Sequence, residues 1–212
     1  MPDAPRPFNP NLHPRAFNTI KWGMDDLRSD EALMLAYRDG DAGAFDILYG
    51  RNRGKLFRYL THQASSYADE LFQDIWMRVV GARAGYVVTA KFSTWLFRIA
   101  HNRLMDHFRA QGRSIIEFSE PQTDEDDGPA LDPAAPAEVQ PETMLARKDL
   151  AQRILSALAE LPTSQREAFL LTEEGGLSLE EIAIATGVGK ETAKSRLRYA
   201  LERLRRTLRD AT

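Results

Sequence analysis

Apolar residues recur along this chain at steps of three and four, the spacing that places them on one face of an α-helix. In the first half, this pattern predicts helices just after Ser29, after Asp41, over Ala68–Val80 and over Phe92–Ala110. The glycine-containing stretch 81–85 interrupts the pattern between the last two. No segment is a good strand candidate, so the sequence predicts an all-α fold.

The second half predicts four more helices. The first begins near Glu142 and ends at Pro162, because a proline disfavours the helical conformation of the residue before it. Thr163 or Ser164 is expected to cap the next helix, which ends at Gly175-Gly176.

The last two predicted helices form a motif of their own. Ser178 and Glu181 have the spacing of a capping box that opens a short helix ending at Thr186. Gly187 follows, where a positive φ is needed, and a long helix begins near Lys190. This last helix carries eight Lys or Arg against two Glu. A capped helix, a glycine turn and a basic helix, in that order, predict a DNA-binding helix-turn-helix.

The charge distribution divides the chain into parts. The 212 residues include 28 Lys and Arg against 31 Asp and Glu, but 114–146 alone holds nine acids, no Lys or Arg, and five of the eleven prolines. Such a segment buries too little apolar surface to fold. We therefore expect a disordered Pro-rich arm over 1–25, helical domains over 26–113 and 147–212, and a flexible acidic linker over 114–146.

The composition also excludes several classes of protein. Without cysteine the chain can form neither a disulfide nor a cysteine-ligated metal site, and it has only four histidines. It has no run of 18 apolar residues and no signal-peptide core, so we expect a cytoplasmic protein without membrane insertion. No nucleophile–base pair, phosphate-binding loop or metal-ligand spacing is present, and we expect no catalytic residue, metal or cofactor.

The helix predicted from Phe92 interleaves aromatic and basic residues, a pattern that suits single-stranded nucleic acid. Phe92 and Trp95 share the apolar stripe and are assigned to the core. Asp106 is expected to orient a neighbouring Arg or Asn. The candidate contacts are the polar residues off the stripe: Arg98, Asn102, Arg103 and Arg109.

Two further polar sets are candidates for binding. The helix after Ala68 clusters acids and an amide that suit either a basic partner protein or a solvated helix start: Asp69, Glu70, Gln73 and Asp74. The last helix presents early polar residues that can reach bases and phosphates in a major groove, although a solvated amphipathic helix is the alternative: Lys190, Glu191, Thr192, Lys194, Ser195, Arg196 and Arg198.

Taken together, these segments resemble the bacterial sigma factors of the sigma-70 class, in the extracytoplasmic-function (ECF) group with two folded domains. ADELFQDIWMRVV is similar to the family's core-polymerase-binding helix, and FSTWLFRIAHNRLMDHFR to its −10-reading helix. ALAELPTSQREAFLL, SLEEIAIATGV and KETAKSRLRYALERLRRTL resemble its −35-reading domain. The order of the motifs across an acidic linker makes the match specific.

The resemblance implies a role for each set. The acidic patch from Asp69 to Asp74 would meet the β′ clamp of core RNA polymerase, with the β flap as a further contact of the factor. Asn102 and the loop up to Lys91 would capture a flipped −10 base, while the arginines after Trp95 hold the strand's backbone. The helix from Lys190 would read the −35 duplex. Promoter DNA and an anti-sigma factor are the other implied partners, and no catalysis is implied.

Two other functions can be distinguished from this one. A stand-alone helix-turn-helix regulator would bind duplex DNA without polymerase. A nucleic-acid enzyme or RNA-binding adaptor is the third possibility, and the sequence offers no catalytic constellation for it.

Overall fold

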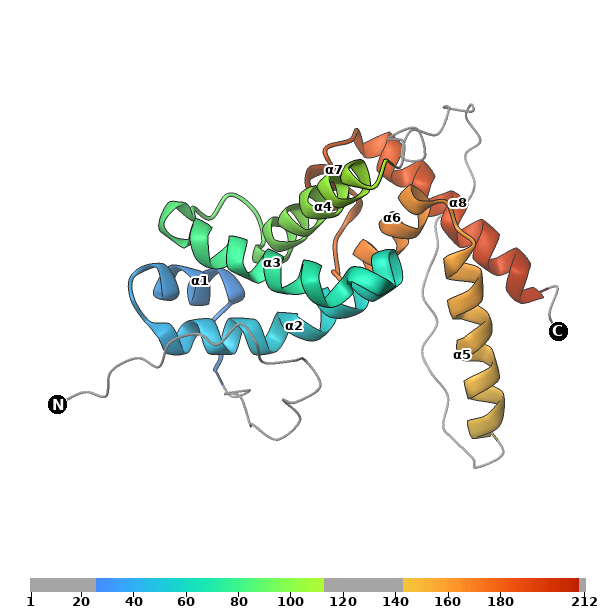
Figure 1. Ribbon diagram of the computed structural model, residues 1–212, viewed down its shortest axis with the longest axis horizontal. Helices are drawn as coiled ribbons and strands as arrows, with labels where there is room; N and C mark the ends of the chain where they lie inside the picture. The colour runs from blue at the N-terminus through green and yellow to red at the C-terminus, as the bar shows by residue number, and fades with distance from the viewer. Residues whose placement is uncertain (1–25, 113–142, 210–212) are drawn as a thin grey trace.

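The computed structural model of the protein describes residues 26–112 and 143–209 (Figure 1). Within these ranges the chain forms eight α-helices and no strand, which confirms the predicted all-α fold. The predicted arm, 1–25, and most of the predicted acidic linker lie outside the described residues. The last residues assigned to that linker, 143–146, belong to the first turn of a helix.

The N-terminal helices follow the predicted pattern closely. They are α1 (Asp30–Arg38), α2 (Ala42–Ala64), α3 (Ala68–Ala82) and α4 (Phe92–Ala110). Short 3-10 turns at Ser65–Tyr67 and Arg83–Gly85 lead into α3 and follow it.

Side-chain caps explain where the first two helices begin. The Ser29 hydroxyl accepts a hydrogen bond from the Ala32 N–H at 3.2 Å, and the Asp41 carboxylate accepts one from the Ala44 N–H at 3.1 Å. Each cap satisfies a backbone donor that has no partner inside its helix, so the sequence marks both helix starts.

The C-terminal helices are α5 (Thr143–Ala159), α6 (Thr163–Glu173), α7 (Leu179–Thr186) and α8 (Lys190–Arg209). The expected cap of α6 was wrong. Thr163 is already helical, Pro162 occupies the cap position, and no side chain caps this end. The Pro162 carbonyl instead accepts the first helical hydrogen bond, from the Arg166 N–H at 2.9 Å.

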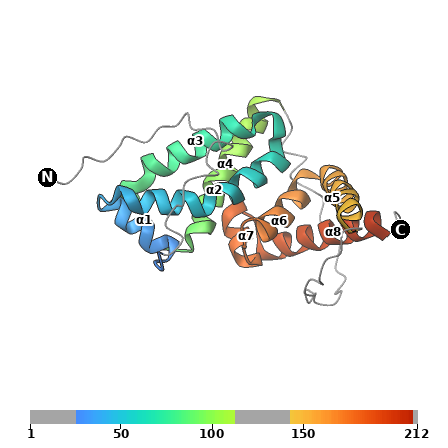
Figure 2. The same cartoon turned by 90° about the horizontal axis from the view of Figure 1, so that it is seen from below.

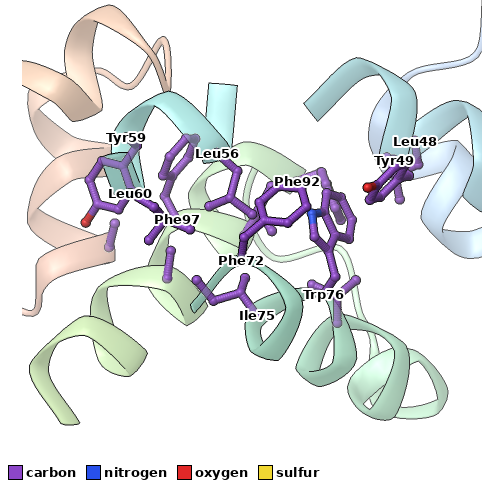
Figure 3. Packing of buried hydrophobic residues seen from close by; sticks show 14 of the residues in the cluster. Leu48, Tyr49, Leu56, Tyr59, Leu60, Phe72, Ile75, Trp76, Phe92 and Phe97 are labelled. Carbon is purple, nitrogen blue, oxygen red and sulfur yellow. The ribbon is translucent and has the colours of Figure 1, made fainter. Parts of the chain in front are cut away.

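Aromatic side chains fill the core between α2, α3 and α4 (Figure 3). Trp76 is 1% exposed, and its ring meets that of Phe45 edge-on, with 5.8 Å between the centroids. Tyr49 packs against the same indole at 4.8 Å. Such edge-to-face pairs contribute beyond simple burial, so these rings help to hold α2 against α3.

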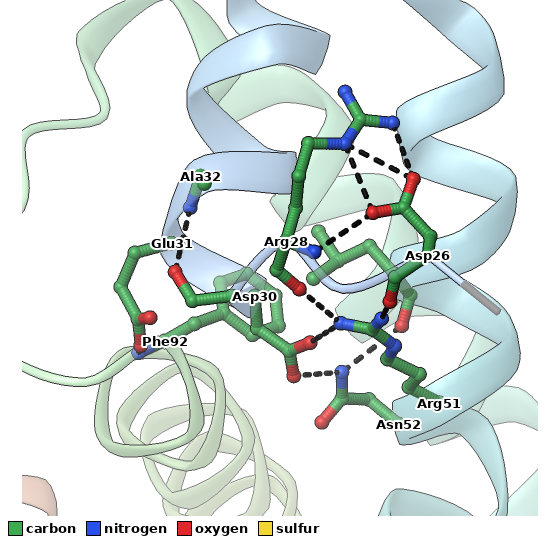
Figure 4. A network of polar contacts seen from close by, with 10 residues as sticks. Asp26, Arg28, Asp30, Glu31, Ala32, Arg51, Asn52 and Phe92 are labelled. Carbon is green, nitrogen blue, oxygen red and sulfur yellow. Dashed lines mark hydrogen bonds and ion pairs between the residues drawn. The ribbon is translucent and has the colours of Figure 1, made fainter. Parts of the chain in front are cut away.

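A polar network fastens the start of α1 to α2 and α4 (Figure 4). The Asp30 carboxylate accepts hydrogen bonds from Arg51 at 3.0 Å and from Asn52 at 2.8 Å. The Glu31 carboxylate accepts the Phe92 N–H, the first of α4, at 2.6 Å. Burial alone would raise the pKa of Glu31, but this and other hydrogen bonds hold the pKa below its ordinary value.

The two sets of helices pack against each other. Helix α7 lies along α4 and α6 lies against α2, while α5 and α8 extend away from the N-terminal helices (Figures 1 and 2). Buried residues of α6 and α7, such as Leu170 and Ile182, join the same apolar cluster as the N-terminal core. A second, smaller cluster between α5 and α8 holds Leu158 and Leu204.

We expect Trp76→Ala to lower the free energy of unfolding by about 3–5 kcal/mol, because it removes a large buried ring and leaves a cavity. Met77→Ala on the same helix is the matched control, since Met77 is 48% exposed and should change stability by less than about 0.5 kcal/mol. Urea unfolding followed by far-UV circular dichroism measures both. Equal effects from the two substitutions would contradict the packing described here.

Candidate functional site

The outer face of α3 carries the predicted acidic patch. Asp69, Glu70 and Gln73 are exposed, whereas Leu71 and Ile75 of the same helix are fully buried. The helix therefore has one face in the core and a polar face toward solvent. Exposed apolar side chains border the patch at Tyr67 and Met77, and a surface of this mixed kind suits a protein partner.

Arg103 of α4 is directed toward that patch. Its guanidinium forms an ion pair with Asp74 and lies 3.6 Å from a carboxylate oxygen of Glu70. The Arg103 side chain is only 15% exposed. The structure thus joins a predicted DNA contact to two predicted protein contacts, and in this arrangement Arg103 links α3 to α4.

The other predicted residues of α4 are more accessible. Arg98, Asn102 and Arg109 are all exposed on the helix. Arg109 pairs with Asp106 at 3.0 Å, as expected of an acid that orients a neighbouring arginine. Lys91, just before α4, instead pairs with Glu181 of α7 at 3.1 Å.

The loop before α4 is held at its base and exposed at its tip. Tyr86 is 3% exposed, and its ring packs against Trp95 with 5.0 Å between centroids. Phe92 is fully buried as predicted, while Trp95 is partly buried against the same core. Val87 and Val88 point outward, at 66% and 47% exposed. Apolar side chains beside an exposed polar helix face can contact unstacked bases.

Helices α7 and α8 form the predicted helix-turn-helix. The Ser178 N–H donates to Glu181 at 2.9 Å, and the Glu181 N–H donates to the Ser178 hydroxyl at 3.3 Å, which completes the capping box. Gly187 ends α7 with φ of 70°, a conformation that a side chain would strain. Ala193 is fully buried and allows α8 to approach α7 closely.

The predicted polar residues of α8 differ in how they are held. Lys190 pairs with Glu180 of α7, and Lys194 lies 4.0 Å from Glu191. The Ser195 hydroxyl donates to a backbone carbonyl of its own helix. Near its start, α8 is exposed at Lys190, Glu191 and Lys194, whereas the remaining members are partly buried: Thr192, Ser195, Arg196 and Arg198.

A buried carboxylate lies between the two sets of helices. Glu167 of α6 is 2% exposed, and one of its oxygens accepts the Tyr59 hydroxyl at 2.6 Å. His101 Nδ1 of α4 lies 2.8 Å from the same oxygen. Burial, together with the nearby carboxylate, raises the pKa of the Tyr59 hydroxyl well above its ordinary value. Arg58 and Glu174 form a further ion pair across the interface at 2.7 Å.

Each half of the chain matches a known protein family. Residues 48–114 match sigma-70 region 2, and residues 151–204 match sigma-70 region 4. ECF RNA polymerase sigma factor SigM of Mycobacterium tuberculosis is 33% identical over 191 residues, which is 89% of each chain. The chain belongs to the ECF family of RNA polymerase sigma factors. Its function is therefore promoter-directed initiation of transcription, and a stand-alone regulator is not favoured.

Other relatives of this sigma factor extend the comparison. Sigma factor CarQ of Myxococcus xanthus is 29% identical and covers 82% of this chain and 95% of its own length. The ECF sigma-E factor of Escherichia coli K12 is also 29% identical, over 84% of this chain and 94% of its own length. These relatives are sigma factors rather than enzymes.

Two solved structures share the fold of the sigma factor. CnrH, in complex with the cytosolic domain of CnrY, has a TM-score of 0.60 at 24% identity and covers 87% of this chain and all of CnrH. RpoE of Bartonella quintana, in complex with the anti-sigma factor NepR, has a TM-score of 0.56 at 24% identity and covers 78% of this chain and 96% of RpoE.

Sequence reasoning about the sigma factor missed the contacts between its halves. Tyr59, His101 and Glu167 meet across more than 60 residues of chain, and no spacing rule connects them. The signal for a buried acid in the sequence was Glu167 itself, because it directly precedes the apolar residues 168–171 of α6. In 26–112 and 143–209, no acid or histidine cluster could hold a metal ion, and no helix is long and apolar enough to cross a membrane.

We expect the Asp74→Ala and Arg103→Ala substitutions in the sigma factor to be coupled by about 0.5–1 kcal/mol in a double-mutant cycle, because their ion pair is partly exposed. The measurement is the free energy of unfolding of the four variants. Asp74→Ala with Arg98→Ala is the control pair and should be additive, since Arg98 is exposed on another face of α4. Additivity of both pairs would show that Arg103 is not held by α3.

Proposed function

We propose that the outer face of α3 binds the β′ clamp of core RNA polymerase. The proposal is supported by the exposure of Asp69, Glu70 and Gln73 on a helix whose other face is fixed in the core. A rigid helix holds its polar side chains ready for a basic partner surface, so little conformational entropy is lost on binding. The β flap is proposed as a second contact of the sigma factor.

We further propose that α4 and the loop before it read the −10 element as a single strand. Asn102 is exposed and can both donate to and accept from a base edge. Arg98 and Arg109 are exposed beside it and can neutralise backbone phosphates. Lys91 and Arg103 would join this set only after exchanging their present carboxylate partners for DNA. Binding of a flipped base by these residues would offset the free energy of unstacking that base, which is about a few kcal/mol.

The −35 element is proposed to be read as duplex DNA by α8. The observation that carries this proposal is the capped helix-turn-helix, whose short α7 supports a recognition helix with an exposed, charged first turn. In this motif, residues near the start of the second helix contact base edges in the major groove. The basic residues farther along α8 can hold phosphates on either side.

The proposed domains are an arm over 1–25, region 2 over 26–113, a linker over 114–146 and region 4 over 147–212. Two modest DNA-binding surfaces on one chain act at a high effective concentration once both engage. We propose that this happens in the bacterial cytoplasm on core polymerase. An anti-sigma factor is proposed as a further partner, supported by the complexes of CnrH with CnrY and of RpoE with NepR.

We expect Asp69→Arg to weaken binding to purified bacterial core polymerase while far-UV circular dichroism stays unchanged. The added positive charge would repel the basic surface that the patch is proposed to meet. Gln73→Ala tests the same face without changing the charge. Asp46→Arg is the control, because Asp46 is an exposed acid on α2. Co-elution and titration with core measure the effect, and unchanged affinity in both test variants would contradict the assignment of α3.

We expect Arg196→Ala to cost roughly 1–3 kcal/mol of promoter binding and to relax specificity at one position of the −35 element. Arg205→Ala is the control, since Arg205 is exposed near the far end of α8. The measurement is holoenzyme binding to a set of promoters, each with one base pair changed. A loss that is uniform over all sequences would make Arg196 a phosphate contact instead.

A further inference from the structure

The far half of α8 presents a concentrated positive surface. From Glu202 to the end of the helix, one acid accompanies four exposed arginines, which we call the arginine face: Arg203, Arg205, Arg206 and Arg209. Arg206 pairs with Glu202 at 3.4 Å, and no other carboxylate in 26–112 or 143–209 forms an ion pair with this face. Like charges three or four positions apart on a helix repel one another, so the arginine face favours an acidic partner.

The described part of the fold supplies no such partner. A comparable basic run on α2 does have partners, since Arg51 pairs with Asp30 and Arg58 pairs with Glu174. The far half of α8 instead projects from the body beside α5, which packs on it through apolar side chains (Figures 1 and 2). The helix dipole favours arginine only in the last turn of α8. An acidic partner must therefore come from outside the described residues.

The segment 114–142, which joins the two halves and lies outside the described residues, has the complementary charge. It holds nine acids and no Lys or Arg, and four of the acids are consecutive, from Asp124 to Asp127. We call these four residues the acidic run. The arm over 1–25 is unsuited, because its three Lys or Arg outnumber its two Asp. Within this chain, the acidic run is thus the best match in charge for the arginine face.

The acidic run is close enough along the chain to reach α8. Thr143, the start of α5, lies 16 positions after Asp127, and 16 residues span at most about 55 Å. From Thr143 to Leu158, α5 rises about 22 Å. Leu158 shares an apolar cluster with Leu204 of α8, and packed helix axes lie about 8–10 Å apart. The tether therefore exceeds the distance to be covered, and a contact within one chain forms at a high effective concentration.

We propose that the acidic run docks on the arginine face of α8 and competes there with the phosphates of duplex DNA. The inference rests on the proposed −35 role of α8 and adds regulation of that same site by the chain's own linker. Carboxylate and phosphate oxygens both accept paired hydrogen bonds from a guanidinium, so one arginine cannot bind both well at once. The docked run therefore weakens DNA binding by the free sigma factor.

A spin label beside the acidic run tests the docking in the full chain. The chain lacks cysteine, so Thr123→Cys provides a single labelling site. We expect the label to weaken the amide NMR signals of residues 203–209, and neutralisation of the acidic run to restore them. The neutralised variant carries four substitutions: Asp124→Asn, Glu125→Gln, Asp126→Asn and Asp127→Asn. Equal signals from 203–209 with the run intact and neutralised would overturn the docking.

A charge-matched variant separates the acidic run from the overall charge of the linker. It neutralises four other acids of the same segment: Glu117→Gln, Glu120→Gln, Asp132→Asn and Glu138→Gln. We expect this variant to keep the weakened signals of 203–209 at low salt. Equal recovery of the signals in both variants would overturn the assignment to Asp124–Asp127. At about 1 M salt the Debye length falls to about 3 Å, so the label should no longer weaken the signals.

Fluorescence anisotropy of a labelled −35 duplex tests the competition with DNA. We expect the variant with the neutralised run to bind the duplex several-fold more tightly than the charge-matched variant, because both have the same net charge and only the first frees the arginine face. Equal affinities would overturn the competition. If holoenzyme binding shows no dependence on the −35 sequence in any of these proteins, the proposed role of α8 is contradicted, whereas the spin label still reports on the docking.

Discussion

The carboxylate of Glu167 is the interaction on which the arrangement of this sigma factor depends. Glu167 belongs to α6, whereas its two partners belong to the N-terminal helices, Tyr59 to α2 and His101 to α4. Around it, the apolar residues of α6 and α7 continue the core of the N-terminal helices without a break. Because a buried acid tolerates few alternatives, this one contact sets how the two halves meet.

Helix α4 has three faces with different surroundings. Leu96 and Ala100 face the N-terminal core, while Phe97 and His101 face the C-terminal helices. Asn102 is left on the exposed side, where it is proposed to meet DNA. Because the residues for these surfaces alternate along one helix, the face of α4 that is proposed to read DNA lies next to the face that packs against the C-terminal helices.

Local features of this protein could be predicted from sequence, and long-range pairings could not. Helix bounds followed from caps and apolar spacing at Ser29 and Ser178, because those interactions span only a few residues. The pairing of Arg103 with Asp74 was missed, since both residues read equally well as surface groups. Glu167 had no visible partner because Tyr59 lies 108 positions earlier, and only the folded chain brings the two together.

The two halves of the free chain are packed together around the carboxylate of Glu167. The chain lacks cysteine, so labels at Ser66→Cys and Ser156→Cys, both exposed, report one distance between the halves. Single-molecule energy transfer should show high efficiency for the free sigma factor and a lower efficiency when Glu167→Arg places an unpartnered charge between the halves. The same efficiency in both proteins would contradict the packing around Glu167.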